Sequence, residues 1–386
     1  MPFPLLDRSK LHLHSLSERD SKLDIVRHAV PPDSKPAEFS GRGREIMAEC
    51  VEKICAARDD ERPVMLAFGA HAIKNGLAPV LIRLIEEGWI TLLATNGGST
   101  IHDWEFAYQG LTGEDVRGSV EHGHLGIAQE TGLYINLALV VGAYEGLGYG
   151  ESIGRMIERE GLDIPLPDEL IKTATDQAES DPERAAAAID LAGTIRRWDI
   201  APGFLSVPHS YKGFSVQAAA FRLNVPFTVH PMIGHDLIYN HPANHCAAIG
   251  RTAQRDFLTF AHQVHQLDGG VYLSVGSAVM SPMIFEKSLS MAQNLELQNG
   301  ERIGGHHIVI VDLAESTWDW QADGEPHADS PAYYVRYCKT FSRMGGSMRY
   351  LSADNRDFFL TLLQQLRKTN WQSPWKQKDV PPRALP

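Results

Sequence analysis

The sequence has little cysteine and no long hydrophobic run. Its 386 residues include four cysteines with no Cys-x-x-Cys spacing, so we expect neither a disulfide framework nor a cysteine-rich zinc module. The nearest candidate for a membrane span, INLALVVGAY, falls far short of the roughly 18 residues required. The first residues also lack the apolar region of a signal peptide. These absences predict a cytoplasmic protein without a membrane partner.

Positive charge is also scarce. Lysine and arginine number 36 against 48 acidic residues, a formal net charge of −12. Such a surface repels phosphate backbones, so we do not expect a nucleic-acid partner. Hydrophobic residues make up 43% and charged residues 22% of the chain, which is the composition of a globular protein and excludes a disordered or fibrous one.

Three signatures of familiar sites are missing. The chain has no G-x-G-x-x-G after its first expected strand, no G-x-S-x-G nucleophile elbow following an expected strand, and no H-E-x-x-H. An ordinary dinucleotide fingerprint, a serine nucleophile and a zinc-protease site are therefore not expected. Seventeen histidines occur, and His241 and His245 have i,i+4 spacing, but Pro242 between them fits only a first helical turn. We expect no metal site.

Strand-like and helical patterns alternate along most of the chain. PVMLAFG, GLAPVLIRLIEEG and WITLLAT predict a strand, a helix and a strand within about 35 residues, the size of a βαβ unit. Further strands are expected in VPFTVHP, GGVYLSVG, HHIVIVDLAE and SMRYLSADN, and charged helices over 165–200. We predict one α/β domain over 45–370 with a doubly wound, mostly parallel sheet. An N-terminal arm (1–44) and a C-terminal tail (371–386) would flank it.

The strand-like runs end in small or polar residues. In an open parallel sheet, ligands lie outside the carboxyl ends of the strands, where small residues let a ligand approach backbone N–H groups. A single loop rich in Gly, Ser and Asn has the ordinary composition of loops, but several such loops along one edge favour a ligand site. These loops are Gly69–His71, Thr95–Gly98, His230–Pro231, Gly276–Ala278, Ala314–Ser316 and Ser352–Asn355.

One lysine lies in an aromatic context. Pro331 fits a first helical turn, and Tyr333, Tyr334 and Tyr337 after it would form an aromatic face near Lys339. A lysine packed by aromatic rings can lose solvation, lower its pKa and become a nucleophilic amine. The alternative is a solvated surface lysine beside buried tyrosines, which is the commoner case.

Five segments follow the order and spacing of a known enzyme family. AFGAHAIKNGLAPVLIRLIEEGWITLLATNGGSTIHDWE is similar to its strand, loop, helix, strand and Thr-Ala-Gly-Gly loop, and NVPFTVHPMIGHDLIYNHP to its Asp-(apolar)-Ile-(aromatic)-x-His run. VYLSVGSAV is similar to its glycine-rich strand end, and Ala353-Asp354-Asn355 to its Ala-Asp-Ala loop. Asp323-Gly324 and the run from Pro331 to Lys339 match Pro-x-x-x-Val-x-Trp-x-Lys, with Tyr337 in place of Trp. Over most of 62–360 the chain resembles the deoxyhypusine synthase family.

The resemblance implies an NAD-binding fold and a homotetramer with active sites at dimer interfaces. It implies an aminobutyl transferase in which NAD oxidises a polyamine, an enzyme lysine carries the aminobutyl group as an imine, and an acceptor amine receives it. Lys339 corresponds to the catalytic lysine. The expected NAD contacts are Thr95, Asn96, Gly97, Gly98, Gly276, Ser277, Asp323, Gly324, Ala353 and Asp354. The expected substrate contacts are Asp236, His241, Tyr333 and Tyr337. Either Asp103 or Glu105 would match a family acid.

Several positions depart from the family pattern. Ala70 and Lys74 replace two serines, and Tyr333 replaces a glutamate. Ser281 and Pro282 stand where the family has paired histidines. An NAD-binding oxidoreductase with another substrate, using His71, His102 or His235 as acid or base, therefore stays an alternative. A non-catalytic nucleotide-binding protein on the same fold is another.

Overall fold

A parallel sheet runs through the centre of the molecule. The computed structural model describes residues 3–369 and 371, and its main sheet has six strands in the order β10-β9-β8-β2-β3-β7. Every pairing within it is parallel, and the predicted doubly wound α/β fold is confirmed. The strands are β2 (Val64–Phe68), β3 (Leu92–Thr95), β7 (Phe227–Val229), β8 (Val271–Val275), β9 (His307–Asp312) and β10 (Ser347–Ser352).

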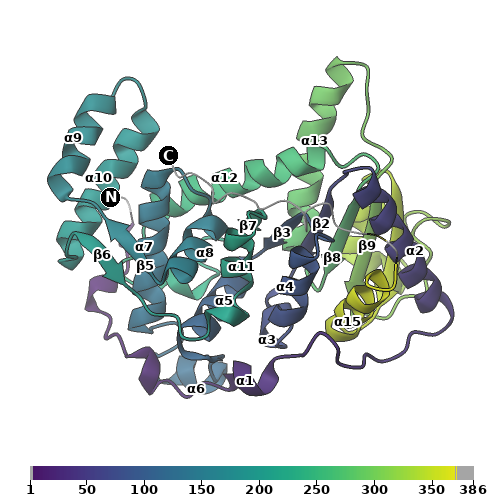
Figure 1. Ribbon diagram of the computed structural model, residues 1–386, viewed down its shortest axis with the longest axis horizontal. Helices are drawn as coiled ribbons and strands as arrows, with labels where there is room; N and C mark the ends of the chain where they lie inside the picture. Colours follow the sequence, from purple (N-terminus) through teal and green to yellow (C-terminus); the bar gives the residue numbers. More distant parts are fainter. Residues whose placement is uncertain (1–2, 370, 372–386) are drawn as a thin grey trace.

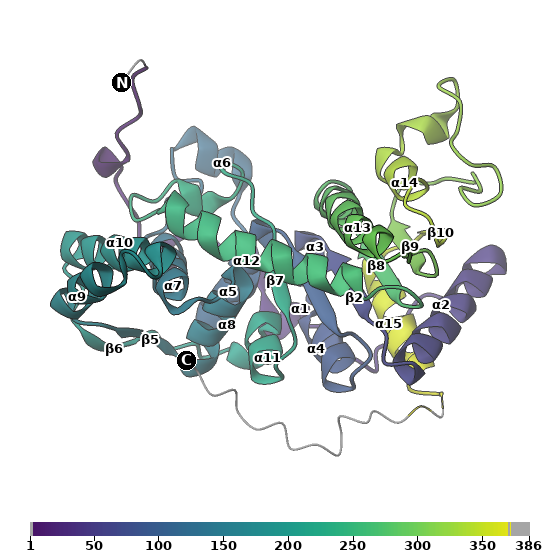
Figure 2. The same cartoon turned by 90° about the horizontal axis from the view of Figure 1, so that it is seen from above.

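Helices cover both faces of this sheet. Along β2, Leu66 and Phe68 belong to one core cluster and Met65 and Ala67 to another, because successive side chains of a strand point to opposite faces. The first face packs against α2 (Gly41–Asp59), α4 (Ala78–Glu86) and α15 (Asn355–Leu366). The second packs against α12 (Cys246–His265), α13 (Met280–Gln298) and α14 (Arg336–Phe341). Figures 1 and 2 show the two layers. Burial on both faces explains why these strands read as continuous apolar runs.

A helical region lies between β3 and β7 in the chain. The predicted helices over 165–200 are present, together with a two-stranded antiparallel sheet, β5 and β6, that we did not expect. Its strand β6 is mostly exposed and carries no apolar alternation. Among the described residues, no helix combines the length and apolar character of a membrane-spanning segment. The elements are α5 (Gly97–Gln109), α6 (Val116–Glu121), α7 (Gln129–Glu145), α8 (Tyr149–Arg159), β5 (Gly161–Ile164), α9 (Pro167–Gln177), α10 (Pro182–Trp198), β6 (Gly203–Ser206), η3 (Lys212–Phe214) and α11 (Val216–Arg222).

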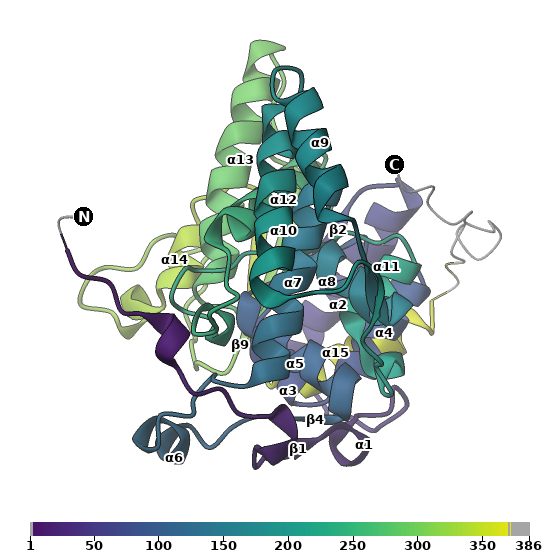
Figure 3. The same cartoon turned by 90° about the vertical axis from the view of Figure 1, so that its left-hand side faces the viewer.

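The N-terminal segment docks on this helical region. Strand β1 (Leu23–Asp24) pairs with β4 (Leu111–Thr112), and Figure 3 shows both beside α1 (Ile25–His28) and α6. The Arg19 guanidinium lies 2.7 Å from Glu105 and 3.3 Å from Glu114. The predicted arm is thus fixed by pairing and charge. Of the predicted tail, residues 372–386 lie outside the described part of the chain. The remaining short elements are η1 (Arg8–Lys10), η2 (Leu16–Glu18), α3 (Ala70–Lys74), η4 (Leu237–Tyr239) and η5 (Pro331–Tyr334).

Gly150 lets α8 approach β7 closely, so we predict that Gly150→Ala destabilises the fold. A Cβ at this position would overlap the Phe227 carbonyl oxygen, a backbone atom with little room to move. We expect a loss of about 1–3 kcal/mol, the usual cost of overpacking. Gly193→Ala in α10 is the matched control, because nothing lies within 4 Å of its Cβ position, and it should gain up to about 1 kcal/mol of helix propensity. Urea unfolding of both variants measures the difference, and equal stabilities would contradict the prediction.

Candidate functional site

The carboxyl ends of the six strands share one edge of the sheet. From β2 the chain continues to β3 and β7 on one side, and from β8 it continues to β9 and β10 on the other. The strand order therefore reverses between β2 and β8, where the two following loops touch: Gly69 N–H donates to the Val275 carbonyl at 3.2 Å. In open α/β sheets a crevice outside such a reversal point is the usual ligand site.

The turn from β3 into α5 is held by its own polar side chains. The Thr95 hydroxyl is fully buried, 2.8 Å from the Phe68 carbonyl oxygen and 2.6 Å from Ser99 Oγ. Asn96 caps α5, with its Oδ1 accepting from Ser99 N–H at 3.0 Å. Of the predicted cofactor contacts in this turn, Thr95 is thus engaged internally, and half-buried Gly98 is the glycine with more accessible surface.

Asp236 lies against the first turn of α5. A Cβ at Gly97 would overlap its carboxylate, so Gly97 is glycine because Asp236 occupies the space. Asp236 is only 9% exposed, and its Oδ2 has no hydrogen-bond partner. The hydroxyl of buried Tyr239 also lacks a partner, and burial, followed by the Asp236 charge, raises the pKa values of Tyr239 and Tyr149. Burial raises the pKa of Asp236 to about 6. Acceptors left unpaired in this way are costly and suit a donor supplied by a ligand.

The turns after β8 and β10 are more open. Gly276 is exposed with φ +58°, and nothing lies within 4 Å of its Cβ position. Ser277 is buried and its Oγ accepts from Ser281 N–H at 3.3 Å. Ala353 directly follows β10, and exposed Asp354 caps α15 by accepting from Arg356 N–H at 2.8 Å. All four predicted cofactor contacts here lie at the carboxyl edge.

Asp323 and Gly324 lie elsewhere, in the long connection between β9 and η5. Both are exposed. Asp323 N–H donates to the Asp319 carbonyl at 2.7 Å, and the Gly324 carbonyl accepts from Trp318 Nε1 at 3.0 Å. These contacts build a turn inside the connection, so the pair does not follow a strand end directly.

Lys339 lies between an acid and an aromatic ring. Its Nζ is 2.8 Å from Glu325 Oε1 and 3.8 Å from the centroid of the Tyr333 ring. The hydrogen bond with Glu325, followed by Tyr333, raises the pKa of Lys339 above its ordinary value. This direction is opposite to the lowering we considered for an aromatic-packed lysine, because a carboxylate is paired with the amine. Nothing in the sequence spacing pointed to Glu325, which precedes Lys339 by fourteen residues in an aperiodic segment.

Tyr337 faces away from Lys339. The expected continuous helix from Pro331 is broken: the 3-10 turn η5 ends at Tyr334, and α14 begins at Arg336. The Tyr337 hydroxyl lies 3.4 Å from that of Tyr350 on β10. The expected single aromatic face is therefore wrong, and Tyr333 is the tyrosine that contacts Lys339.

His241 is buried among helices. Its ring stacks on Trp198 with 5.4 Å between centroids, Nδ1 accepts from Ala243 N–H, and Nε2 lies 3.3 Å from Gln129 Oε1. Burial lowers the pKa of His241 to about 4, so the ring is neutral. The contacts assign it a packing role between η4, α7 and α10.

The two candidate family acids in α5 are both engaged internally. Asp103 is buried and accepts from Ser215 Oγ at 2.6 Å and from Val216 N–H at 2.8 Å, at the start of α11. Glu105 pairs with Arg19 and accepts from Thr131 at 2.9 Å. Neither carboxylate is free to meet a cofactor. Within residues 3–369 and 371, no group of three or more His, Cys, Asp or Glu side chains could hold a metal ion.

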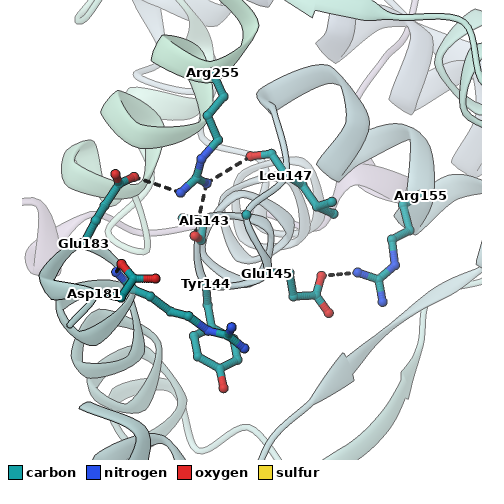
Figure 4. Close-up of a pocket in the computed structure, with 10 residues that line it drawn as sticks. Ala143, Tyr144, Glu145, Leu147, Arg155, Asp181, Glu183 and Arg255 are labelled. Atoms are coloured by element: carbon teal, nitrogen blue, oxygen red, sulfur yellow. Dashed lines mark hydrogen bonds and ion pairs between the residues drawn. The ribbon is translucent and has the colours of Figure 1, made fainter. Parts of the chain in front are cut away.

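A separate cavity of about 410 Å³ lies where α7 ends and α10 begins (Figure 4). Arg255 donates to the carbonyls of Ala143 and Leu147, at 3.1 and 3.2 Å, and lies 2.8 Å from Glu183. Glu145 pairs with Arg155. These charges compensate one another, and no predicted site residue lines the cavity.

Comparison with known proteins finds no matching family model and no matching curated protein. Matching solved structures include ArgZ, an arginine dihydrolase from the ornithine-ammonia cycle in cyanobacteria (14% identity, 85% of this chain, 33% of that chain, TM-score 0.40). They also include a conserved putative LOR/SDH protein from Methanococcus maripaludis S2 (11% identity, 87% of this chain, 70% of that chain, TM-score 0.41). A third is the ternary complex of AgrE with ornithine and NAD+ (14% identity, 86% of this chain, 34% of that chain, TM-score 0.40). The chain spans about a third of the length of the ArgZ and AgrE chains. Identity and TM-score at this level do not define a family for it.

We predict that Asp236→Asn removes a pH dependence of stability. The pKa of Asp236 in the folded protein, about 6, lies above its ordinary value, so its stabilising effect is complete below pH ~4 and is lost as the pH rises through 6. Between pH 4 and 7 the wild type should lose up to about 3 kcal/mol of unfolding free energy relative to the variant. The control Asp115→Asn removes an exposed carboxylate whose pKa is lowered, first by Lys22; because this group is ionised in both states above pH ~4, the variant's profile should run parallel to that of the wild type between pH 4 and 7. Chemical denaturation across this pH range decides the matter; parallel profiles for Asp236→Asn and wild type would refute the assignment.

Proposed function

We propose that the chain is an NAD-dependent aminobutyl transferase of the deoxyhypusine or homospermidine synthase type, acting through Lys339. The observation that carries the proposal is the setting of this amine, which lies against the Tyr333 ring and a carboxylate in the connection between two neighbouring strands. A primary amine held in one place is what imine formation requires.

The carboxyl edge fits a dinucleotide in part. Gly276 leaves open space at the reversal point between β2 and β8, and Gly98 exposes backbone at the start of α5. NAD would be held by these glycines, with Ala353 and Asp354 along the same edge, where backbone groups can approach its phosphates and ribose. When bound, NAD would supply acceptance of a hydride from the carbon beside the substrate amine and its later return.

Asp236 fits an ammonium group. Its unpartnered Oδ2 is a buried acceptor, and the Tyr239 hydroxyl, also unpartnered, is close enough for its pKa to be raised in part by the Asp236 charge. A cationic amine arriving here would satisfy the carboxylate and offset its burial. We therefore propose that Asp236 and Tyr239 hold one end of a polyamine. His241, packed inside the fold, supports this pocket and does not contact the substrate.

The transfer step then belongs to Lys339. The oxidised substrate carries a C=N bond; neutral Nζ adds to its carbon, and the original amine leaves after taking up a proton. The aminobutyl group stays on Lys339 as a new C=N bond, which the acceptor amine attacks in turn. The acceptor leaves with the group, and Nζ regains its proton.

The two halves of this site are separated within one chain. Lys339 lies in the connection between β9 and β10, whereas Asp236 packs against α5, which follows β3. Strands β8 and β2 lie between, so β9 and β3 are three spacings apart, roughly 14 Å. Figure 2 shows α14 and α5 toward opposite ends of the sheet. We propose that a second copy completes the site, in a homotetramer whose active sites lie between subunits.

Borohydride trapping tests the transferase. Protein incubated with NAD, spermidine and borohydride should gain an aminobutyl adduct that peptide mapping locates on Lys339, since reduction fixes the C=N bond. Lys339→Arg should abolish the adduct. Lys287→Arg is the matched control, because Lys287 is also paired with a glutamate, Glu286, and should react as wild type. No adduct in protein that binds NAD would favour an oxidoreductase or a non-catalytic nucleotide-binding protein.

Subunit mixing tests the shared site. Lys339→Ala and Asp236→Asn should each be inactive alone. Co-expressed with different tags, they should recover about a quarter of the wild-type rate, because random pairing leaves one intact site in each mixed dimer. A mixed complex that stays inactive, although both tags co-purify, would show that each site is built within one subunit.

A further inference from the structure

Glu325 is shared between two cations. One oxygen, Oε1, lies 2.8 Å from Lys339 Nζ. The other, Oε2, accepts from Arg343 through Nη2 at 2.6 Å and Nε at 3.0 Å. Arginine binds a carboxylate oxygen through a rigid planar fork, so it fixes the direction of the Glu325 side chain.

The three residues come from separate elements around α14. Glu325 belongs to the connection after β9, Lys339 to the second turn of α14, and Arg343 to the segment that follows it. The Tyr333 ring, from η5, lies on another side of Nζ, 3.8 Å away. Glu325, Tyr333 and, across the carboxylate, Arg343 are the charged and titratable groups that face the amine.

This arrangement holds Lys339 in its ammonium form. Paired with a carboxylate and resting on the negative face of an aromatic ring, the charged form is favoured over the neutral one. An amine must be neutral to attack an imine. The resting structure therefore places the nucleophile but does not activate it.

We propose that Glu325 is a positioning residue that keeps Lys339 protonated at rest, and that Arg343 retains Glu325 when the amine is released. The inference rests on Lys339 being the reactive amine of the proposed function. When Lys339 loses its proton and turns toward the substrate, Glu325 keeps its two hydrogen bonds to Arg343 and is not left unpaired. Release is then less costly than breaking an isolated ion pair, because one partner of the carboxylate remains.

The same arrangement accounts for a departure from the family pattern. Tyr333 stands where the resembled family has a glutamate near its lysine. Here the aromatic ring contacts the amine, and the carboxylate comes from Glu325 in the preceding connection. An acid beside the lysine is thus kept, although it comes from another position in the chain.

Competitive labelling of lysines tests the proposal without NAD or substrate. Protein is treated with trace acetic anhydride from pH 7 to 11, and the acetylation of Lys339 is read by peptide mass spectrometry. Glu325→Gln should label Lys339 about threefold or more faster at pH 8, with its profile moved to lower pH, since the neutral amide no longer stabilises the ammonium form. Arg343→Gln should have the opposite effect, because Glu325 then has Lys339 as its single cationic partner. Two single substitutions with opposite signs separate this role from general loosening of the segment.

The control, Glu286→Gln, removes the partner of Lys287 and should leave the Lys339 profile unchanged. An unchanged Lys339 profile in Glu325→Gln, or shifts of the same sign in Glu325→Gln and Arg343→Gln, would overturn the proposal. Because labelling needs no chemistry from the substrate, shifted profiles without a borohydride adduct would refute the transferase and keep only the role of Glu325 in holding Lys339 protonated. An adduct on Lys339 together with unshifted labelling profiles would support the transferase and overturn this inference.

Discussion

The order in which the strands enter the sheet constrains everything else in this molecule. Winding outward from β2 and β8 in two directions, the chain brings its strand ends to one edge but sends the later βα units to opposite ends of the sheet. In open α/β sheets a ligand usually binds at the point where the strand order reverses, here between β2 and β8. The same winding separates the amine-carrying connection from the buried carboxylate. The same strand order therefore explains both why the strand ends meet at one edge and why Lys339 and Asp236 lie apart.

Two carboxylates of the proposed site, Asp236 and Glu325, behave in contrasting ways because their surroundings differ. Asp236 is buried with an unpartnered oxygen, and desolvation favours its protonated form. Glu325 is far more exposed, and its hydrogen bonds to Lys339 and Arg343 lower its pKa. Asp236 lacks a hydrogen-bond donor, whereas Glu325 has two cationic donors. In the proposed reaction the substrate ammonium would donate to Asp236, and Lys339 would leave Glu325, which would keep Arg343.

The sequence was sufficient for the sheet because strands buried on both faces leave uninterrupted apolar runs, such as Val64–Phe68 and Val271–Val275. The sequence could not predict contacts between distant segments that carry no hydrophobic periodicity. Glu325 lies in a connection with no periodicity, so nothing linked it to Lys339. The aromatic face failed because a 3-10 turn of three residues per turn precedes α14 and shifts the phase at Val335. Gly97 matched a cofactor loop by residue type, yet the side chain that lies against it is that of Asp236, which follows β7 much further along the chain.

The docking of Arg19 has a consequence for the order of folding. This arginine is synthesised early, but its partners Glu105 and Glu114 come 86 and 95 residues later. On the ribosome, at roughly 5–20 residues per second, the segment therefore waits several seconds before its partners exist. Its closing contacts are long-range, and their loop-closure entropy must be paid before the contacts can stabilise the fold. The segment around Arg19 is thus made before its partners but fixed only after them, and until then Glu105 and Glu114 remain two neighbouring acids without their cation.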